Sequence, residues 1–116
     1  MILGIGIDIV EVARISKAMK SSKFIERVLT ESERRIELSP QRVAGRWAAK
    51  EAVAKALSCD LHWHDVEISN DDLGAPVVRI LKQNVLKTHS RVWISISHER
   101  GHAAAVAVWE SERPIS

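Results

Sequence analysis

Two carboxylates, Asp8 and Glu51, stand at positions where a carboxylate is difficult to explain by structure alone. Asp8 interrupts the apolar run MILGIGIDIV at residues 1–10, which otherwise reads as a buried strand. Glu51 lies inside RWAAKEAVAK at residues 46–55, an alanine-rich segment typical of a helix. If the fold brings the two together, they form a hard-oxygen site for a divalent cation.

Each carboxylate also has a plainer explanation. Asp8 could cap a helix that starts near Glu11, or it could pair with a core lysine, because an unpaired buried charge is costly. Glu51 could pair with Lys55, four residues further on, in the orientation that stabilises helices. The case for function is the conjunction, since Mg²⁺ takes one or two protein carboxylates and completes its shell with water and phosphate oxygens.

Three cations share the segment of Glu51: Arg46, Lys50 and Lys55. Lys50 falls among the apolar positions of the predicted helix, so its ammonium either reaches water past them or is held there for a purpose. The three could neutralise a diphosphate, or they could be ordinary solvated helix residues.

The histidines carry a weaker signal. His98 ends a predicted strand, where it could donate to a phosphate or serve as a hydrogen-bonded structural residue. His62 and His64 would share one face of a strand, but two histidines with no third or fourth ligand in view do not predict a zinc site.

The strand that carries Asp8 is predicted over residues 2–10. Alternation puts Gly4 and Gly6 on the face of Asp8 and leaves the other face to Leu3, Ile5, Ile7 and Ile9. The missing side chains could leave space for a ligand beside the carboxylate. The alternatives are a β-bulge or a helix packed tightly against the strand.

Helical spacing of Val12, Ile15 and Met19 predicts a helix over about residues 11–21. Basic residues recur every three or four positions from there onward, at Arg14, Lys17, Lys20, Lys23 and Arg27. If the segment stays helical, they form one cationic stripe. Such a stripe is commonly a solvated face, and the alternative is a docking surface for an acidic partner.

Two further helix starts follow. Thr30 and Glu33 match a capping box and open a short helix that ends near residue 38. Ser39 and Pro40 read as an N-cap followed by proline in the first turn. The helix they open is predicted to run to about residue 58 and to be the central helix, because its glycine and alanines allow close packing.

The rest of the chain is rich in strand signals. Strands are predicted over residues 66–69, 76–81, 91–98 and 102–109, with a turn at 70–74 and a short helix at 81–88. Residues 99–101 are predicted to form a hairpin loop in which Gly101 takes a positive φ. The fold class is therefore α+β, a mainly antiparallel sheet packed on one long central helix.

Size and composition limit the function classes. The 116 residues predict a single domain over 1–116, and a net charge of +2 gives no reason to expect nucleic acid. No segment has the length of a membrane span. Cys59 is the only cysteine, which excludes an internal disulfide and a cysteine-based zinc site and favours a reducing compartment. We therefore expect a cytoplasmic enzyme or binding module.

Three segments resemble, in order, the motifs of the holo-acyl-carrier-protein synthases, the short 4′-phosphopantetheinyl transferases. GIGIDIVE at residues 4–11 resembles their opening motif, AGRWAAKEA at 44–52 their second and ISISH at 94–98 their third. Order, spacing and total length agree, so the resemblance covers essentially the whole chain.

The resemblance implies a reaction. Coenzyme A gives its 4′-phosphopantetheine arm to a serine of an apo-acyl carrier protein, for fatty-acid biosynthesis, and leaves adenosine 3′,5′-bisphosphate. The catalytic residues would be Asp8, Glu51 and Lys55, with Asp8 and Glu51 holding Mg²⁺, or Mn²⁺ in its place, against the diphosphate. A metal-bound water or Glu51 itself would take the serine proton.

The same resemblance implies the partners. Contacts to coenzyme A fall to Arg46, Lys50, Lys55, Gly74, Pro76 and His98. The basic residues from Arg14 to Arg27 become a docking face for the acidic carrier protein. A single-copy subunit of this family implies an oligomer, expected to be a homotrimer with sites between subunits.

Two positions depart from the family pattern. Ala75 replaces the lysine of a Gly-Lys-Pro turn, so one phosphate contact is missing or supplied elsewhere. Arg34 and Arg35 occupy a region where some relatives carry an acid, and no catalytic role is assigned there. The competing interpretation is a module that binds coenzyme A without catalysis. Binding alone needs the cations, whereas the Asp8–Glu51 pair favours a metal and therefore catalysis.

Overall fold

The computed structural model describes residues 1–112, so the last four residues of the predicted domain lie outside the described part. In chain order the elements are β1 (Ile2–Glu11), α1 (Val12–Ala18), α2 (Ser22–Val28), the 3₁₀ turn η1 (Glu33–Arg35), α3 (Pro40–Leu57), the 3₁₀ turn η2 (Trp63–Asp65), β2 (Val66–Asn70), β3 (Pro76–Ile80), β4 (Ser90–His98) and β5 (His102–Ser111). Every strand pair is antiparallel, in a three-stranded sheet of order β1-β5-β4 and a two-stranded sheet of β2 and β3.

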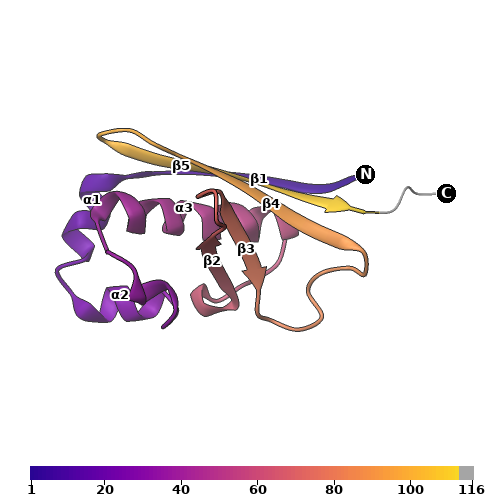
Figure 1. The fold of residues 1–116 in the computed structure, drawn as a ribbon, viewed down its shortest axis with the longest axis horizontal. Helices are drawn as coiled ribbons and strands as arrows, with labels where there is room; N and C mark the ends of the chain where they lie inside the picture. The colour runs from indigo at the N-terminus through magenta and orange to yellow at the C-terminus, as the bar shows by residue number, and fades with distance from the viewer. Residues whose placement is uncertain (113–116) are drawn as a thin grey trace.

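Helix α3 is the centre of the fold. It runs beneath the three-stranded sheet, with α2 and the β2–β3 hairpin on its other side (Figure 1). Because both layers cover α3, its buried residues are not confined to one stripe. The predicted α+β architecture, a mainly antiparallel arrangement around one long helix, is confirmed.

Local signals set both ends of α3. The Ser39 hydroxyl accepts a hydrogen bond from the Arg42 amide at 3.2 Å, and Pro40 occupies the first turn, as predicted. At the other end Ser58 takes the left-handed conformation, with φ 48°, and its amide closes the last turn.

The glycines of β1 admit α3 and leave no space for a ligand. A Cβ built on Gly4 would overlap the carbonyl oxygen of Ala56, and one on Gly6 would overlap that of Ala52. The pairing of β1 with β5 also shifts register between Ile2 and Gly4. The structure thus decides for the tightly packed helix, with a bulge-like irregularity beside it, and against an open space next to Asp8.

The opposite face of β1 is apolar and exposed. Ile5, Ile7 and Ile9 are 65%, 66% and 66% exposed, and Trp93 of β4 is 49% exposed. The predicted alternation therefore holds, but only the face of Gly6 and Val10 lies in the core. A face of this kind commonly marks an interaction surface.

The basic segment is not one helix, which corrects the predicted stripe. Helix α1 ends at Ala18, the chain turns through residues 19–21, and α2 begins at Ser22. The break lets Phe24 and Val28 of α2 join Val12 and Ile15 of α1 in the core. The capping box of Thr30 and Glu33 forms as predicted, but it opens only η1 and not a helix to residue 38.

Two turn predictions are wrong. No helix forms over residues 81–88, where Asn84 takes a left-handed φ of 63° that a helix does not accommodate. The loop at 99–101 closes β4 on β5 as predicted, but the glycine with a positive φ is Gly74, at 87°, and not Gly101. Within residues 1–112, no helix has the length and apolar character needed to cross a membrane.

Candidate functional site

Asp8 and Lys55 meet at the contact between β1 and α3. The Lys55 ammonium lies 3.3 Å from Asp8 Oδ1 and donates a hydrogen bond of 2.9 Å to the carbonyl oxygen of Ile7. Ile7, Asp8, Ile9, Lys55 and Ala104 line a cavity of ≈ 290 Å³ there. Asp8 therefore pairs with a lysine at the edge of a cavity, but this lysine is 54% exposed and is not the core lysine of the plainer explanation.

Glu51 lies one helical turn before Lys55, on the same side of α3. Lys55 is engaged with Asp8, so the alternative Glu51–Lys55 pair does not form. Among residues 1–112 the Glu51 carboxylate, which is partly buried, has no hydrogen bond or ion pair. A partly buried carboxylate without a partner is available to a ligand.

Asp8 on β1 and Glu51 on α3 would suit only a metal that takes much of its shell from water and substrate. Within residues 1–112 no group of three or more His, Cys, Asp or Glu side chains could hold a metal ion. Two carboxylates are within the range that Mg²⁺ accepts when phosphate oxygens complete its shell. The unpartnered Glu51 is the feature of this structure that fits such an ion.

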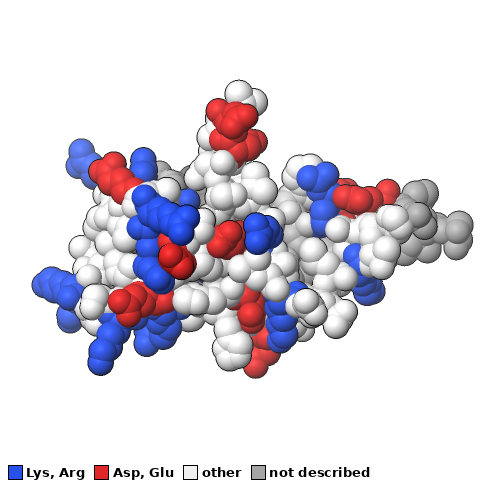
Figure 2. Space-filling model, turned by 60° about the horizontal axis from the view of Figure 1, so that its bottom comes forward, with Lys and Arg blue, Asp and Glu red and all other residues white. Residues whose placement is uncertain are grey.

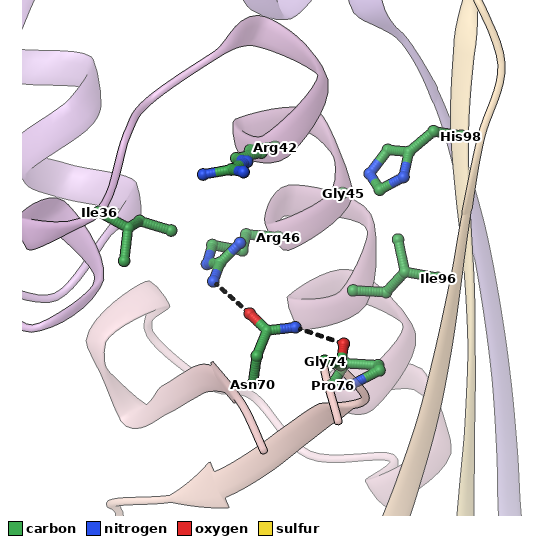
Figure 3. Close-up of a pocket in the computed structure, with 9 residues that line it drawn as sticks. All are labelled: Ile36, Arg42, Gly45, Arg46, Asn70, Gly74, Pro76, Ile96 and His98. Atoms are coloured by element: carbon green, nitrogen blue, oxygen red, sulfur yellow. Dashed lines mark hydrogen bonds between the residues drawn. The ribbon is translucent and has the colours of Figure 1, made fainter. Parts of the chain in front are cut away.

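A second cavity, of ≈ 430 Å³, lies between α3, the end of β4 and the β2–β3 turn (Figure 3). We call it the Arg46 cavity. It is lined by Ile36, Arg42, Gly45, Arg46, Asn70, Gly74, Pro76, Ile96 and His98. The structure thus brings together four of the residues predicted to contact coenzyme A, which are Arg46, Gly74, Pro76 and His98.

Arg42 and Asn70 line the Arg46 cavity but were not predicted from the sequence. Arg42 precedes Arg46 by one helical turn, so the spacing alone could have identified it. Asn70 is 24 positions away from Arg46, and no local pattern links them. Its side chain accepts a hydrogen bond from Arg46 at 3.3 Å and donates one to the Gly74 carbonyl at 3.0 Å.

The Arg46 cavity is electropositive. None of its lining residues carries a carboxylate, whereas Arg42 and Arg46 carry two positive charges. Burial lowers the pKa of the Arg46 guanidinium from its ordinary value, the positive charge of Arg42 acts in the same direction, and Glu33 opposes both. A bound anion would relieve this repulsion between like charges.

His98 reaches this cavity because residue 45 is a glycine. A Cβ built on Gly45 would lie 2.6 Å from His98 Nε2 and 3.1 Å from Ile96 Cγ2, so any other residue would displace the imidazole. Among residues 1–112 the ring of His98 has no hydrogen-bond partner. The alternative of a hydrogen-bonded structural histidine therefore finds no support.

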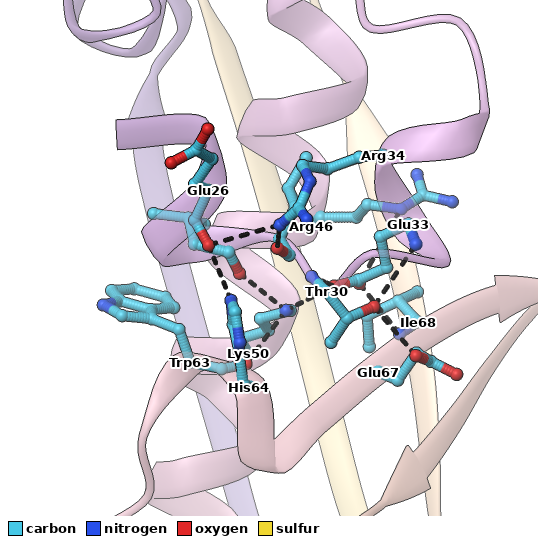
Figure 4. A network of polar contacts seen from close by, with 12 residues as sticks. Glu26, Thr30, Glu33, Arg34, Arg46, Lys50, Trp63, His64, Glu67 and Ile68 are labelled. Carbon is cyan, nitrogen blue, oxygen red and sulfur yellow. Dashed lines mark hydrogen bonds and ion pairs between the residues drawn. The ribbon is translucent and has the colours of Figure 1, made fainter. Parts of the chain in front are cut away.

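Lys50 points away from both cavities. Its ammonium donates to Glu33 Oε1 at 2.6 Å, to the Val28 carbonyl at 2.7 Å and to the Trp63 carbonyl at 3.0 Å (Figure 4). Its side chain is only 2% exposed, and all three of its N–H groups are used. This geometry argues against the predicted contact between Lys50 and coenzyme A.

The five predicted docking residues all lie on the surface of α1, α2 and the turn between them. None of them forms an ion pair within the described part of the chain. Figure 2 shows Lys and Arg side chains projecting from the end of the molecule that these two helices form in Figure 1.

Comparison with known protein families shows which family the chain belongs to. A family model described as the 4′-phosphopantetheinyl transferase superfamily matches residues 4–107. The chain belongs to this superfamily. The family expected from the three motifs is therefore confirmed.

Relatives of this transferase match it over nearly its whole length. A holo-[acyl-carrier-protein] synthase of Geobacillus sp. (strain WCH70) is 47% identical over 121 residues, which cover 95% of this chain and 98% of the relative. Another, from Clostridium tetani, is 40% identical over 124 residues, which cover 97% and 98%.

Solved structures of related synthases have the same fold as this chain. A holo-(acyl-carrier-protein) synthase from Bacillus anthracis, in complex with CoA (3′,5′-ADP), has a TM-score of 0.83 at 42% identity and covers 96% of this chain and 98% of its own. The Helicobacter pylori synthase, in complex with coenzyme A, also has a TM-score of 0.83, at 36% identity, and covers 91% and 99%.

Proposed function

We propose that this transferase moves the 4′-phosphopantetheine arm of coenzyme A to a serine of an apo-acyl carrier protein in fatty-acid biosynthesis. The reaction follows from family membership and from relatives of 40% and 47% identity that are named holo-[acyl-carrier-protein] synthases. The structural observation that carries the proposal is the electropositive Arg46 cavity, where four of the six predicted coenzyme A contacts converge.

The Arg46 cavity would hold phosphates of coenzyme A. Guanidinium groups bind phosphate oxygens in pairs, and Arg42 and Arg46 supply two of them on one helix face. His98 adds a ring nitrogen from the end of β4. Gly74 and Pro76 would border the adenosine from the β2–β3 turn.

Asp8, Glu51 and Lys55 would act on the diphosphate. Bound Mg²⁺, or Mn²⁺ in its place, would be held by Asp8 and Glu51 and would supply Lewis acidity. As the serine oxygen bonds to the β-phosphorus, Glu51 would accept the serine proton, and the bond to the departing adenosine 3′,5′-bisphosphate breaks. Lys55 would offset the negative charge on the leaving oxygens, because its side chain is 54% exposed and can reach a ligand.

The whole site would form between copies of this chain. The cavity at Asp8 and the Arg46 cavity share no lining residue. The strand order places β1, with Asp8, and β4, with His98, at opposite edges of the sheet. Ile7 lines the cavity at Asp8 and also belongs to the exposed apolar face, so a second copy covering that face would border Asp8. We propose that three copies of the chain form this assembly, a homotrimer. We also propose that it acts in the cytoplasm.

The acidic carrier protein would dock on α1 and α2. Their five exposed cations have no ion-pair partner within residues 1–112 and are free to meet acidic side chains. Electrostatic complementarity of this kind speeds association more than it strengthens binding.

The test is incubation of the protein with an apo-acyl carrier protein, coenzyme A and Mg²⁺, followed by mass spectrometry of the carrier. We expect the carrier to gain one phosphopantetheine unit and adenosine 3′,5′-bisphosphate to appear in equal amount. Coenzyme A binding without any mass gain, while a control synthase modifies the same carrier, would favour the non-catalytic binding module instead.

A further inference from the structure

Glu33 is a buried carboxylate at the centre of a polar network (Figure 4). Its side chain is 1% exposed. Oε1 accepts hydrogen bonds from the Thr30 amide at 2.8 Å and from the Lys50 ammonium at 2.6 Å, and Oε2 accepts one from the Ile68 amide at 3.0 Å.

Two cations compete for this one carboxylate, and their contacts are unequal. Lys50 makes the short contact of 2.6 Å. Arg46 Nε stays 4.0 Å from Oε2, beyond hydrogen-bond distance, and has no hydrogen-bond partner although it is buried. Lys50 therefore makes the closer contact with Glu33, while Arg46 is paired with it only at 4.0 Å and keeps Nε without a hydrogen bond.

The Arg46 guanidinium, which Glu33 only partly neutralises, lines the Arg46 cavity. Arg46 donates through Nη2 to the neutral side chain of Asn70, and its nearest cavity-lining charge is the like charge of Arg42. A direct Arg46–Glu33 pair would cancel the charge that a phosphate needs. Three contacts oppose that arrangement: Lys50 holds Oε1 of Glu33, the Ile68 amide holds Oε2, and Asn70 holds Arg46 Nη2. Lys50 is the one of the three that brings a competing charge.

We propose that Lys50 is a positioning residue that sets the charge of the Arg46 cavity. By binding Glu33, it keeps this carboxylate from pairing with Arg46 and leaves the Arg46 guanidinium to phosphates of coenzyme A. The inference rests on the proposed function, because it assumes that coenzyme A occupies this cavity.

The test measures the affinity of three variants for adenosine 3′,5′-bisphosphate and for coenzyme A by titration calorimetry. Lys50→Met frees Glu33 to pair with Arg46 and should weaken binding about tenfold or more. Glu33→Gln removes the competing carboxylate and should bind at least as tightly as the unchanged protein. Glu33→Gln combined with Lys50→Met should recover most of the affinity lost in Lys50→Met.

These opposite signs separate charge control from a purely structural role. Both single variants disturb a buried network and should lower the unfolding temperature. If Lys50 were only structural, both would also weaken binding, and the double variant would be no better than Lys50→Met; that pattern overturns the inference. If Lys50→Met does not fold, Glu33→Gln decides alone, and weaker binding by it overturns the inference.

Two further variants serve as controls. Lys82→Met removes the same charge from an exposed lysine and should leave both affinities unchanged; an equal loss there would mean that only net charge matters and would overturn the inference. Arg46→Gln tests the proposed function itself and should weaken binding. If Arg46→Gln weakens binding and Lys50→Met does not, the inference fails while the assignment of the cavity stands. If neither does, the assignment itself fails.

Discussion

Two lysines of α3, five positions apart, meet opposite environments. The Lys50 side chain is 2% exposed and holds Glu33, whereas that of Lys55 is 54% exposed and lies beside Asp8. A buried ammonium with three acceptors is too costly to move, but an exposed one can exchange Asp8 for a ligand oxygen. At the scale of single residues, exposure therefore favours Lys55 for contact with a substrate and Lys50 for a role inside the protein.

Replacing either carboxylate of the proposed metal site should stop the reaction without unfolding the protein. We expect Asp8→Asn and Glu51→Gln each to lower kcat by about a hundredfold or more, because each removes a charge needed for Mg²⁺ and for the transition state. Carrier modification, followed by mass spectrometry across a range of Mg²⁺ concentrations, measures the effect.

The matched control for these variants is Asp60→Asn, which neutralises an exposed acid beyond the end of α3. It should keep the rate of the unchanged protein. Near-normal activity of Asp8→Asn or Glu51→Gln, at any Mg²⁺ concentration, would show that the metal assignment is wrong.

At the scale of elements, the contact between β1 and α3 leaves no room for a methyl group. We expect Gly6→Ala to lower the free energy of unfolding by about 3 kcal/mol, because the new Cβ meets the backbone of Ala52, which cannot move aside as a side chain can. Denaturant unfolding measures the loss. Gly101→Ala is the matched control, since nothing lies within 4 Å of a Cβ there, and an equal loss in both variants would refute the packing argument.

The next prediction concerns α1 and α2, on which we propose that the carrier protein docks. Neutralising Arg14, Lys17 and Lys20 together, each to Gln, should raise the KM for the carrier about tenfold and weaken its dependence on salt. Neutralising the exposed Lys82 and Lys87 should change neither quantity. Steady-state kinetics at two ionic strengths measures the KM and its salt dependence. An unchanged KM would show that these residues are only solvated surface cations.

At the scale of the whole molecule, the outer face of the three-stranded sheet is where copies of the chain should meet. Ile7 is 66% exposed and lies next to Asp8, so assembly and catalysis should fail together. We expect Ile7→Asp to give a folded monomer without transferase activity, because a carboxylate buried in an apolar interface loses its hydration. Light scattering coupled to size exclusion measures the mass.

The control for assembly is Leu81→Asp, which changes an exposed apolar residue next to the other sheet. It should leave mass and activity unchanged. A fully active monomer of Ile7→Asp would show that one subunit contains the complete site.

Much of the fold could be predicted because its signals are local. The N-cap at Ser39, the proline after it and the Thr30–Glu33 capping box each involve neighbouring residues, and the period of two in β1 identified its two faces. The helix predicted over about residues 11–21 ends at Ala18, and helix α2 was missed, because α2 depends on how Phe24 and Val28 reach the core. That information lies in packing and not in the segment itself.

For the candidate site, too, the sequence predicted some features, and others required the tertiary structure. The sequence by itself determined the family and singled out the two carboxylates and the expected coenzyme A contacts, because residue type and motif order suffice for these. Only the tertiary structure decided that the glycines of β1 admit a helix and that Lys50 belongs to Glu33 while Lys55 belongs to Asp8. The physical reason is that the partner of a charge is chosen by distance and burial, and both arise only when segments far apart in the chain come together.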